Sequence, residues 1–170
     1  MKKTTEIECC ECGKICGPEL VKYIDGKPVC IKCLYGDVEP LVIRPIGYVV
    51  NDKERNKAGF GTTGSNVSKI ELLPGMVRFM KGLEDETHLT VLWQLHKARA
   101  VKTVFARGWD GKQVGPFASR TPDRLTQIAV TDVELIGVEG TTLVVRGLDA
   151  INGTPVLDIK VSRKSLDRSN

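Results

Sequence analysis

The stretch "HLTVLWQLH", residues 88–96, shows the alternation that decides the fold class of this chain. Successive side chains of a β-strand point to opposite faces. One face of this stretch therefore carries apolar side chains: Leu89, Val91, Trp93 and Leu95. The other face is mixed and includes both histidines of the chain, His88 and His96. This pattern predicts a strand with one face in a core and the other half solvated.

Similar short β-rich runs, separated by turn signals, recur from residue 41 to residue 161. Many short strands at even spacing predict an antiparallel barrel or sandwich. A helix is expected only within "LPGMVRFMKGLEDE", residues 73–86. No glycine-rich nucleotide fingerprint follows a strand, and no P-loop is present, so a doubly wound nucleotide-binding fold is not supported. The runs expected to be strands are 41–50, 65–73, 88–96, 101–108, 124–140, 141–151 and 154–161.

The segment "GLDAINGTPVLDIKV", residues 147–161, contains the strongest turn signal. The pair Asn152-Gly153 predicts a tight hairpin with a primed turn, which requires positive φ at both central residues. Asp149, Thr154 and Asp158 gather around the same turn. The hairpin signal does not explain this concentration of polar groups, which raises the question whether the turn is also a wall of a binding site.

All six cysteines lie between residues 9 and 33, and four of them form two C-x-x-C pairs: Cys9, Cys12, Cys30 and Cys33. This spacing is typical of a four-cysteine zinc site. Cys10 and Cys16 are left over, and Cys10 is an alternative ligand to Cys9. An iron–sulfur cluster and a redox-active pair are the alternatives to zinc. We expect a zinc ribbon over residues 1–37, a main domain over 41–162 and a polar tail over 163–170.

Composition places few limits on function. The 170 residues are 41% hydrophobic, with a net charge of +4, and contain neither a long apolar run nor a secretory signal. We therefore expect a cytoplasmic protein without a membrane segment.

The segment from Lys97 to Arg124 is basic: it contains seven basic and two acidic residues, and three aromatic residues lie among them. Cations and flat rings together suit RNA, although a solvated loop would have the same composition.

Several motifs resemble the TrmO family, also called TsaA-like proteins. "GPFASRTPDR" (115–124) is similar to the family stretch "GVFATRSPDRPNPIG", and "GLDAINGTPVLDIK" (147–160) to "GLDxxDGTPVLDIKPY". "GLEDETHLTVLWQLHKA" (82–98) is similar to the family's "GLxxLExFSHLxVLFxFHxA". The match covers about residues 46–161. The cysteine segment separately resembles the zinc ribbons of E-subunit-type proteins of formylmethanofuran dehydrogenase, which implies a binding module.

The TrmO resemblance implies a small all-β, barrel-like methyltransferase fold that works as a homodimer with S-adenosylmethionine. The family activity is N6-methylation of a modified adenosine beside the anticodon of certain tRNAs. The implied cofactor residues are His96, Arg120, Ala150, Ile151, Asn152, Gly153 and Thr154. The backbone N–H groups of the Asn-Gly turn are expected to contact the cofactor. No residue is assigned as a general base, and Asp149, Asp158 and His88 are candidates.

Two loops depart from the family pattern. The family's "RPNPIG" reads "RLTQIA" at residues 124–129, and "KAGFGTTGS" at 57–65 replaces its "PRQ" loop. The first hypothesis, which follows from the resemblance, is that the protein is a methyltransferase for tRNA. Its rivals are a cofactor-binding or docking protein without activity, and a methyltransferase for a small molecule or a protein. In each rival the ribbon recruits a protein partner.

Overall fold

The computed structural model describes residues 6–52, 66–97 and 101–166. The chain divides into two compact units. The barrel unit contains residues 43–96 and 128–170, and the ribbon unit contains residues 1–42 and 97–127. The main domain expected over 41–162 is thus interrupted by a segment that groups with the cysteine module.

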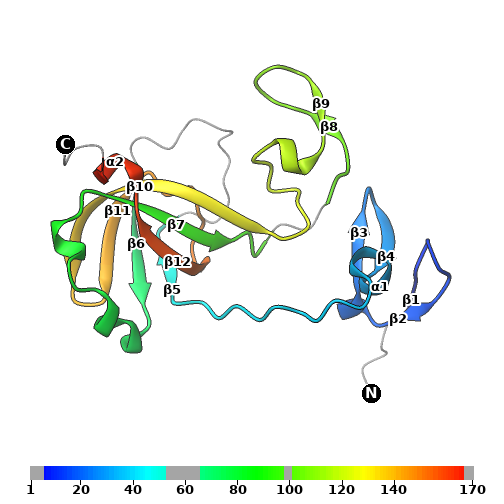
Figure 1. The fold of residues 1–170 in the computed structure, drawn as a ribbon, viewed down its shortest axis with the longest axis horizontal. Helices are drawn as coiled ribbons and strands as arrows, with labels where there is room; N and C mark the ends of the chain where they lie inside the picture. Colours follow the sequence, from blue (N-terminus) through cyan, green and yellow to red (C-terminus); the bar gives the residue numbers. More distant parts are fainter. Residues whose placement is uncertain (1–5, 53–65, 98–100, 167–170) are drawn as a thin grey trace. The chain divides into compact units, whose positions relative to one another are not determined.

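The barrel unit is a closed barrel of six antiparallel strands in the order β10-β11-β6-β5-β12-β7 (Figure 1). Pairing of β10 with β7 closes it, so the all-β barrel predicted from the sequence is confirmed. Two 3₁₀ helices and one short α-helix complete the described part. The elements are β5 (Gly47–Val50), β6 (Val67–Leu72), η2 (Pro74–Phe79), η3 (Leu83–Asp85), β7 (His88–Gln94), β10 (Ile128–Glu139), β11 (Thr142–Arg146), β12 (Pro155–Val161) and α2 (Arg163–Leu166).

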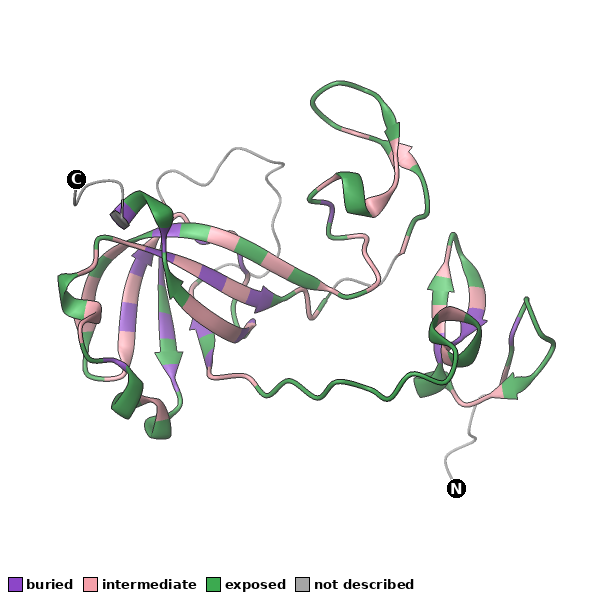
Figure 2. Ribbon diagram, viewed as in Figure 1, coloured by how far each residue is buried: buried purple, intermediate pink, exposed green. Residues whose placement is uncertain are grey.

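Strand β7 buries the face that the sequence pattern predicts. Leu89, Val91 and Trp93 are at most 7% exposed, whereas the alternate positions are half-buried or exposed. The same alternation is visible along β6 in Figure 2. Inward side chains from all six strands form one apolar core, and Leu95 packs against it just beyond the end of β7. Burial of this core supplies the main driving force for folding of the unit.

The helix expected within residues 73–86 is present as two short 3₁₀ helices, η2 and η3. Gly82 lies between them with a φ of +88°, and a left-handed glycine ends a helical segment. The start of the strand expected over 41–50 was wrong: the strand begins only at Gly47, after Pro45, which has no N–H to donate to a ladder.

The hairpin expected at Asn152-Gly153 is also wrong. β11 pairs with β10 and β6, whereas β12 pairs with β5 and β7, so residues 147–154 cross between strands that are not neighbours. Of the described non-glycine residues, Asp25 and Gln127 have positive φ, and Asn152 does not. Gly153 has a φ of +74°, and the Thr154 N–H donates to the Ile151 carbonyl at 3.2 Å. Positive φ at the second central residue alone is the pattern of a type II turn.

The ribbon unit consists of very short elements. Residues 21–30 form a hairpin, and its turn residues Asp25 and Gly26 have φ of 49° and 78°, as a primed turn requires. Antiparallel pairing joins β1 with β2, β3 with β4, and β8 with β9. The elements are β1 (Ile7–Glu8), β2 (Ile15–Cys16), η1 (Pro18–Leu20), β3 (Val21–Ile24), β4 (Lys27–Cys30), α1 (Ile31–Tyr35), β8 (Phe105–Ala106), β9 (Gln113–Val114) and η4 (Pro116–Ala118).

The tail expected over 163–170 begins with the short helix α2. Ser165 in α2 is buried, and its hydroxyl oxygen accepts a hydrogen bond from the His88 N–H at 3.0 Å. None of the helices in the described ranges is long and apolar enough to cross a bilayer.

Gly47 provides a test of the barrel packing. A Cβ at this position would lie 2.5 Å from the Glu71 carbonyl oxygen and 2.9 Å from the Leu72 Cα. Because both are backbone atoms of the paired strand, Gly47→Ala must displace β5 from β6, and we expect a loss of about 2 kcal/mol of unfolding free energy. Thermal and urea unfolding would measure it. Gly75→Ala is the control, since a Cβ there meets no atom within 4 Å; equal effects would contradict the packing argument.

Candidate functional site

The four cysteines of the two C-x-x-C pairs lie together. Their sulfur atoms are all within 4.8 Å of one another. The Cys9 and Cys33 sulfurs are 3.9 Å apart, and those of Cys12 and Cys30 are 3.8 Å apart. Thiolates bound tetrahedrally at a Zn–S distance of about 2.3 Å would be separated by roughly 3.8 Å. The donor set and its spacing therefore fit one tetrahedral metal ion.

The surroundings of Cys9 favour its thiolate form. The Cys30 backbone N–H donates to the Cys9 Sγ at 3.2 Å, and this bond lowers the pKa of the Cys9 thiol to about 6. Cys9 and Cys30 are 1% and 4% exposed. Cys10, the alternative ligand considered from the sequence, is exposed and lies outside the group, as does Cys16.

The turn of the cysteine module is bound to the segment after residue 100. The Asp25 carboxylate accepts hydrogen bonds from the Thr103 N–H at 3.0 Å and from the Thr103 hydroxyl at 2.5 Å. The Asp25 N–H donates to the Val101 carbonyl at 2.9 Å, and Ile24 and Val101 form a parallel bridge. The bond from the Thr103 hydroxyl lowers the pKa of Asp25. We call this contact the Asp25 latch.

A second candidate site lies at one end of the barrel. Thr154 is fully buried, and its hydroxyl lies 3.3 Å from the His96 Nδ1. The strand register explains the contact: Val156 of β12 pairs with Trp93 of β7, so the residues preceding β12 meet those following β7. Two implied cofactor residues that are 58 positions apart in the sequence are thereby brought together.

Hydrogen bonds from Asn51 hold the turn that precedes β12. The Asn51 side-chain amide donates to the Ser68 hydroxyl at 2.9 Å and to the Ala150 carbonyl at 3.0 Å. The Asn51 N–H donates to the Asn152 side-chain oxygen at 3.2 Å. Asn51 was missed in the sequence, where it is a single amide after a strand. Its role depends on contacts across about 100 residues.

Two backbone N–H groups of the turn have acceptors within the barrel. The Gly153 N–H donates to the Val49 carbonyl at 2.8 Å, and the Thr154 N–H donates to Ile151. Both donors are therefore occupied by protein acceptors, because the turn continues the pairing with β5. A Cβ built on Gly153 meets no atom within 4 Å, so the space beside that backbone is open to a ligand.

Arg120 belongs to the ribbon unit and is exposed. The segment that carries it is held by Arg124, which sequence reasoning missed as a functional residue. Arg124 donates from Nε to the Thr121 carbonyl at 2.9 Å and from one Nη to the Ser119 and Pro116 carbonyls at 2.7 Å and 3.1 Å. One guanidinium thus fixes three carbonyl groups around Arg120.

The candidates for a general base lie in different surroundings. His88 begins the seven-residue strand β7 and His96 follows its end, so the rise of a strand places His88 about 20 Å or more from His96. Asp158 forms an ion pair with Lys160 at 2.6 Å. Asp149 immediately precedes Ala150 in the crossover and is half-buried. The loop at residues 57–65, whose sequence differs from the family pattern, lies outside the residues that the structure describes.

The chain is similar to proteins of known family. A family model described as the tRNA-methyltransferase O N-terminal domain matches residues 57–168, which leaves the four cysteines outside the match. A probable S-adenosyl-L-methionine-binding protein of Methanothermobacter thermautotrophicus is 40% identical over 128 residues, covering 74% of this chain and 92% of the relative. A protein of the same description from Archaeoglobus fulgidus is 36% identical over 107 residues, covering 63% of this chain and 29% of the relative.

More distant similarities extend to a named enzyme and its structures. The human tRNA (adenine(37)-N6)-methyltransferase is 37% identical over 84 residues, which are 48% of this chain and 19% of that protein. The crystal structure of TrmO from Pseudomonas aeruginosa aligns with a TM-score of 0.52 and 27% identity, covering 73% of this chain and 56% of that one. The barrel, the matched residues and these relatives agree, and this chain therefore belongs to the TrmO family.

Proposed function

We propose that this chain is an S-adenosylmethionine-dependent methyltransferase that acts on N6 of a modified adenosine in tRNA. The contact between His96 and Thr154 carries the proposal, because it joins the ends of two family motifs at one end of the barrel. The names of the relatives support it, since they include S-adenosyl-L-methionine-binding proteins and tRNA (adenine(37)-N6)-methyltransferases.

The residues at this end of the barrel suit such a cofactor. The polar groups there are the half-buried imidazole of His96, the buried hydroxyl of Thr154 and the exposed side-chain amide of Asn152. A Cβ built on Gly153 would meet no atom within 4 Å, so the backbone at this residue is accessible. Neutral hydrogen-bonding groups and an accessible backbone can hold the polar parts of a nucleoside. S-adenosylmethionine supplies an activated methyl group, whose transfer to nitrogen depends mainly on alignment of donor and acceptor.

The chain's own residues act by positioning. The Thr154 hydroxyl fixes the His96 ring, and the Asn51 bonds fix the turn from Ala150 to Asn152. Arg124 fixes the segment that presents Arg120, for which we propose a contact with the cofactor. Ile151 completes the cofactor residues and is half-buried.

A second candidate function is cofactor binding without methyl transfer. The observation that favours it is Gln127, whose φ is +52°. The family stretch "RPNPIG" places a proline at this position, and proline is restricted to φ near −65°. The loop therefore has a backbone that the family sequence cannot adopt, and the second candidate function attributes a loss of methyl transfer to this change.

The four-cysteine cluster is proposed to hold one structural zinc ion. Four thiolates leave no open coordination position, so the ion stabilises the module instead of activating a substrate. Through the Asp25 latch the same module holds the start of the segment that carries Arg120. The homodimer, the protein partner of the ribbon and the cytoplasmic location stay predictions.

Calorimetric titration with S-adenosylmethionine tests the cofactor site. Thr154→Val removes the hydroxyl at nearly constant volume and frees the His96 ring, so we expect binding about tenfold weaker. Thr90→Val is the control, because its hydroxyl bonds Asp132 on the outer face of β7. Equal affinity in the Thr154 and Thr90 variants would remove His96 and Thr154 from the site.

Methyl transfer separates the two candidate functions. The wild-type protein is incubated with S-adenosylmethionine and tRNA that carries threonylcarbamoyladenosine, and the digested nucleosides are weighed by mass spectrometry. A gain of one methyl group on that nucleoside is the expected result. Cofactor binding without methylation would favour the second candidate, and absence of binding would reject both.

Metal analysis tests the ribbon. Purified protein should contain one zinc ion per chain, and Cys30→Ser should lose it because three thiolates hold the ion far less tightly. Cys16→Ser should keep it, since Cys16 lies outside the cluster. Full zinc retention in the Cys30 variant would reject the ligand set, and iron with labile sulfide would show that the cluster alternative is right.

Hydrogen exchange tests the Asp25 latch. Asp25→Gly keeps the positive φ of the turn but removes both acceptor oxygens, so the amide of Thr103 should exchange much faster. Asp25→Asn retains one acceptor and tolerates the same backbone, so most protection should remain. The barrel peptide 88–94 is the internal reference. Unchanged exchange at Thr103 in the glycine variant would show that the contact does not order this segment.

A further inference from the structure

The hairpin of the ribbon unit displays two aromatic side chains in solvent. It comprises β8, β9, the turn between them and η4, and we call it the aromatic hairpin (residues 105–118). Phe117 is 91% exposed and Trp109 is 63% exposed. Phe105, by contrast, is half-buried. Large apolar rings exposed to this degree on a short, ordered element indicate a contact surface more than a contribution to the core.

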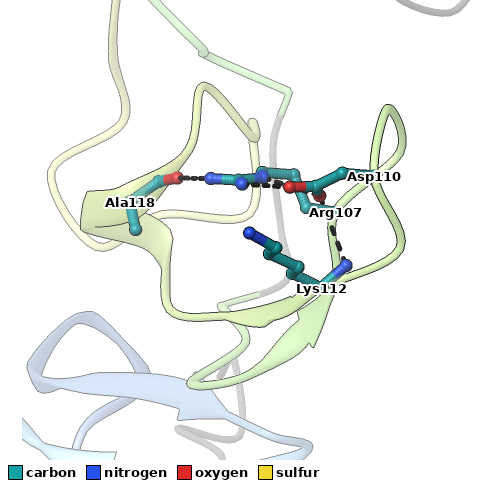
Figure 3. Close-up of polar contacts among 4 residues, drawn as sticks. All are labelled: Arg107, Asp110, Lys112 and Ala118. Carbon is teal, nitrogen blue, oxygen red and sulfur yellow. Dashed lines mark hydrogen bonds and ion pairs between the residues drawn. The ribbon is translucent and has the colours of Figure 1, made fainter.

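Arg107 contacts both the Trp109 ring and the backbone of the turn that carries Phe117. Its guanidinium donates to both carboxylate oxygens of Asp110, one at 3.0 Å, and to the Ala118 carbonyl at 3.2 Å (Figure 3). The same group lies 4.5 Å from the centre of the Trp109 ring. One side chain therefore links the ring of Trp109 to the turn that carries Phe117. The Trp109 ring and the backbone that carries Phe117 are therefore positioned before any partner binds, which reduces the entropic cost of binding.

The turn itself is also well fixed. The Arg107 N–H donates to the Lys112 carbonyl at 2.8 Å, and the Gly111 N–H donates to the Arg107 carbonyl at 2.8 Å. The Lys112 N–H donates to Asp110 at 3.3 Å. The bond from Arg107 lowers the pKa of Asp110, so this carboxylate stays ionised and paired. The charge of Asp110 is thereby balanced within the hairpin.

The remaining charges of the segment are mostly positive. Arg107 is paired with Asp110, and Arg124 bonds backbone carbonyls. Among residues 97 and 101–127, which the structure describes, the exposed cations are Lys97, Lys102, Lys112 and Arg120. Apart from the paired Asp110, the acidic residue there is the half-buried Asp123. A surface with exposed rings between exposed cations matches a ligand that has flat apolar groups on an anionic chain. A protein partner would not require that combination, whereas single-stranded nucleic acid has both features throughout.

We propose that the aromatic hairpin binds single-stranded RNA, with unpaired bases stacked on Trp109 and Phe117 and phosphates near Lys102, Lys112 and Arg120. The proposal deepens the proposed function, since it assigns the surface that would hold the unpaired loop of the methyl acceptor. It requires neither the cofactor nor methyl transfer. Duplex RNA offers phosphates without accessible base faces, so the rings would distinguish the two forms.

The test uses an unmodified RNA stem-loop with a seven-nucleotide loop, labelled with fluorescein, and a fully paired duplex of the same composition. Binding is measured by anisotropy without S-adenosylmethionine. Phe117→Ala and Trp109→Ala should each weaken stem-loop binding about tenfold, which is the typical effect of losing one stacked base. Their effect on the duplex should be less than twofold. Phe79→Ala is the matched control, because Phe79 is 73% exposed on η2 of the barrel unit.

Tryptophan fluorescence gives an independent readout. The chain has two tryptophans, and Trp93 is 7% exposed, so quenching on addition of the stem-loop reports on Trp109. Trp109→Phe keeps a ring and should retain affinity within about threefold while losing the quenching. Unchanged stem-loop affinity in both alanine variants, or an equal loss on stem-loop and duplex, would overturn the proposal. Failure of methyl transfer would leave it intact, because RNA binding is measured directly.

Discussion

The pairing of β7 with two neighbours is the constraint on which the barrel unit depends. β7 pairs with β12 on one side and with β10 on the other, and the second pairing closes the barrel. A closed barrel has no free sheet edge, so every strand is paired on both sides. The inward face of β7 can then remain dry because no edge admits water to the core.

Closure also determines where the inserted segment leaves and rejoins the barrel. The last residue of β7, Gln94, pairs with the first residue of β10, Ile128. The chain between them therefore starts and ends at one position of the ladder, and its length does not disturb the register. Antiparallel pairing of β12 with β7 brings the start of β12 to the same end, where Thr154 meets His96. The barrel register thus brings His96 and Thr154, two of the proposed cofactor residues, into contact.

The ribbon unit is stabilised by different interactions. Its strands have two to four residues and its buried apolar cluster is small, centred on Cys9, Val29 and Cys30. Hydrogen bonds from polar side chains hold its loops in place. The carboxylate of Asp25 and the guanidinium groups of Arg107 and Arg124 each form two or more of these hydrogen bonds. Such charge-assisted bonds are stronger than neutral ones. A bound metal would add the stabilisation that so small a core lacks.

The sequence by itself determined the all-β class, the inward face of β7, the two C-x-x-C pairs and the family. These features are local: an alternation of period two, a spacing of three residues and contiguous motifs require no knowledge of distant contacts. Sequence reasoning went wrong where neighbours along the chain are not neighbours in space. Asn152-Gly153 looks like a hairpin, yet β11 and β12 do not pair.

Only the tertiary structure decided which polar groups meet. Asn51 contacts a turn about 100 residues away, Thr154 contacts His96, and the Asp25 turn binds a segment 78 residues later. It also divided the basic residues of the segment 97–127 into those that hold the backbone, such as Arg107 and Arg124, and those exposed to solvent. The physical reason is that a side chain's role depends on which acceptors the folded backbone places within about 3 Å of it, and residue type alone does not fix this.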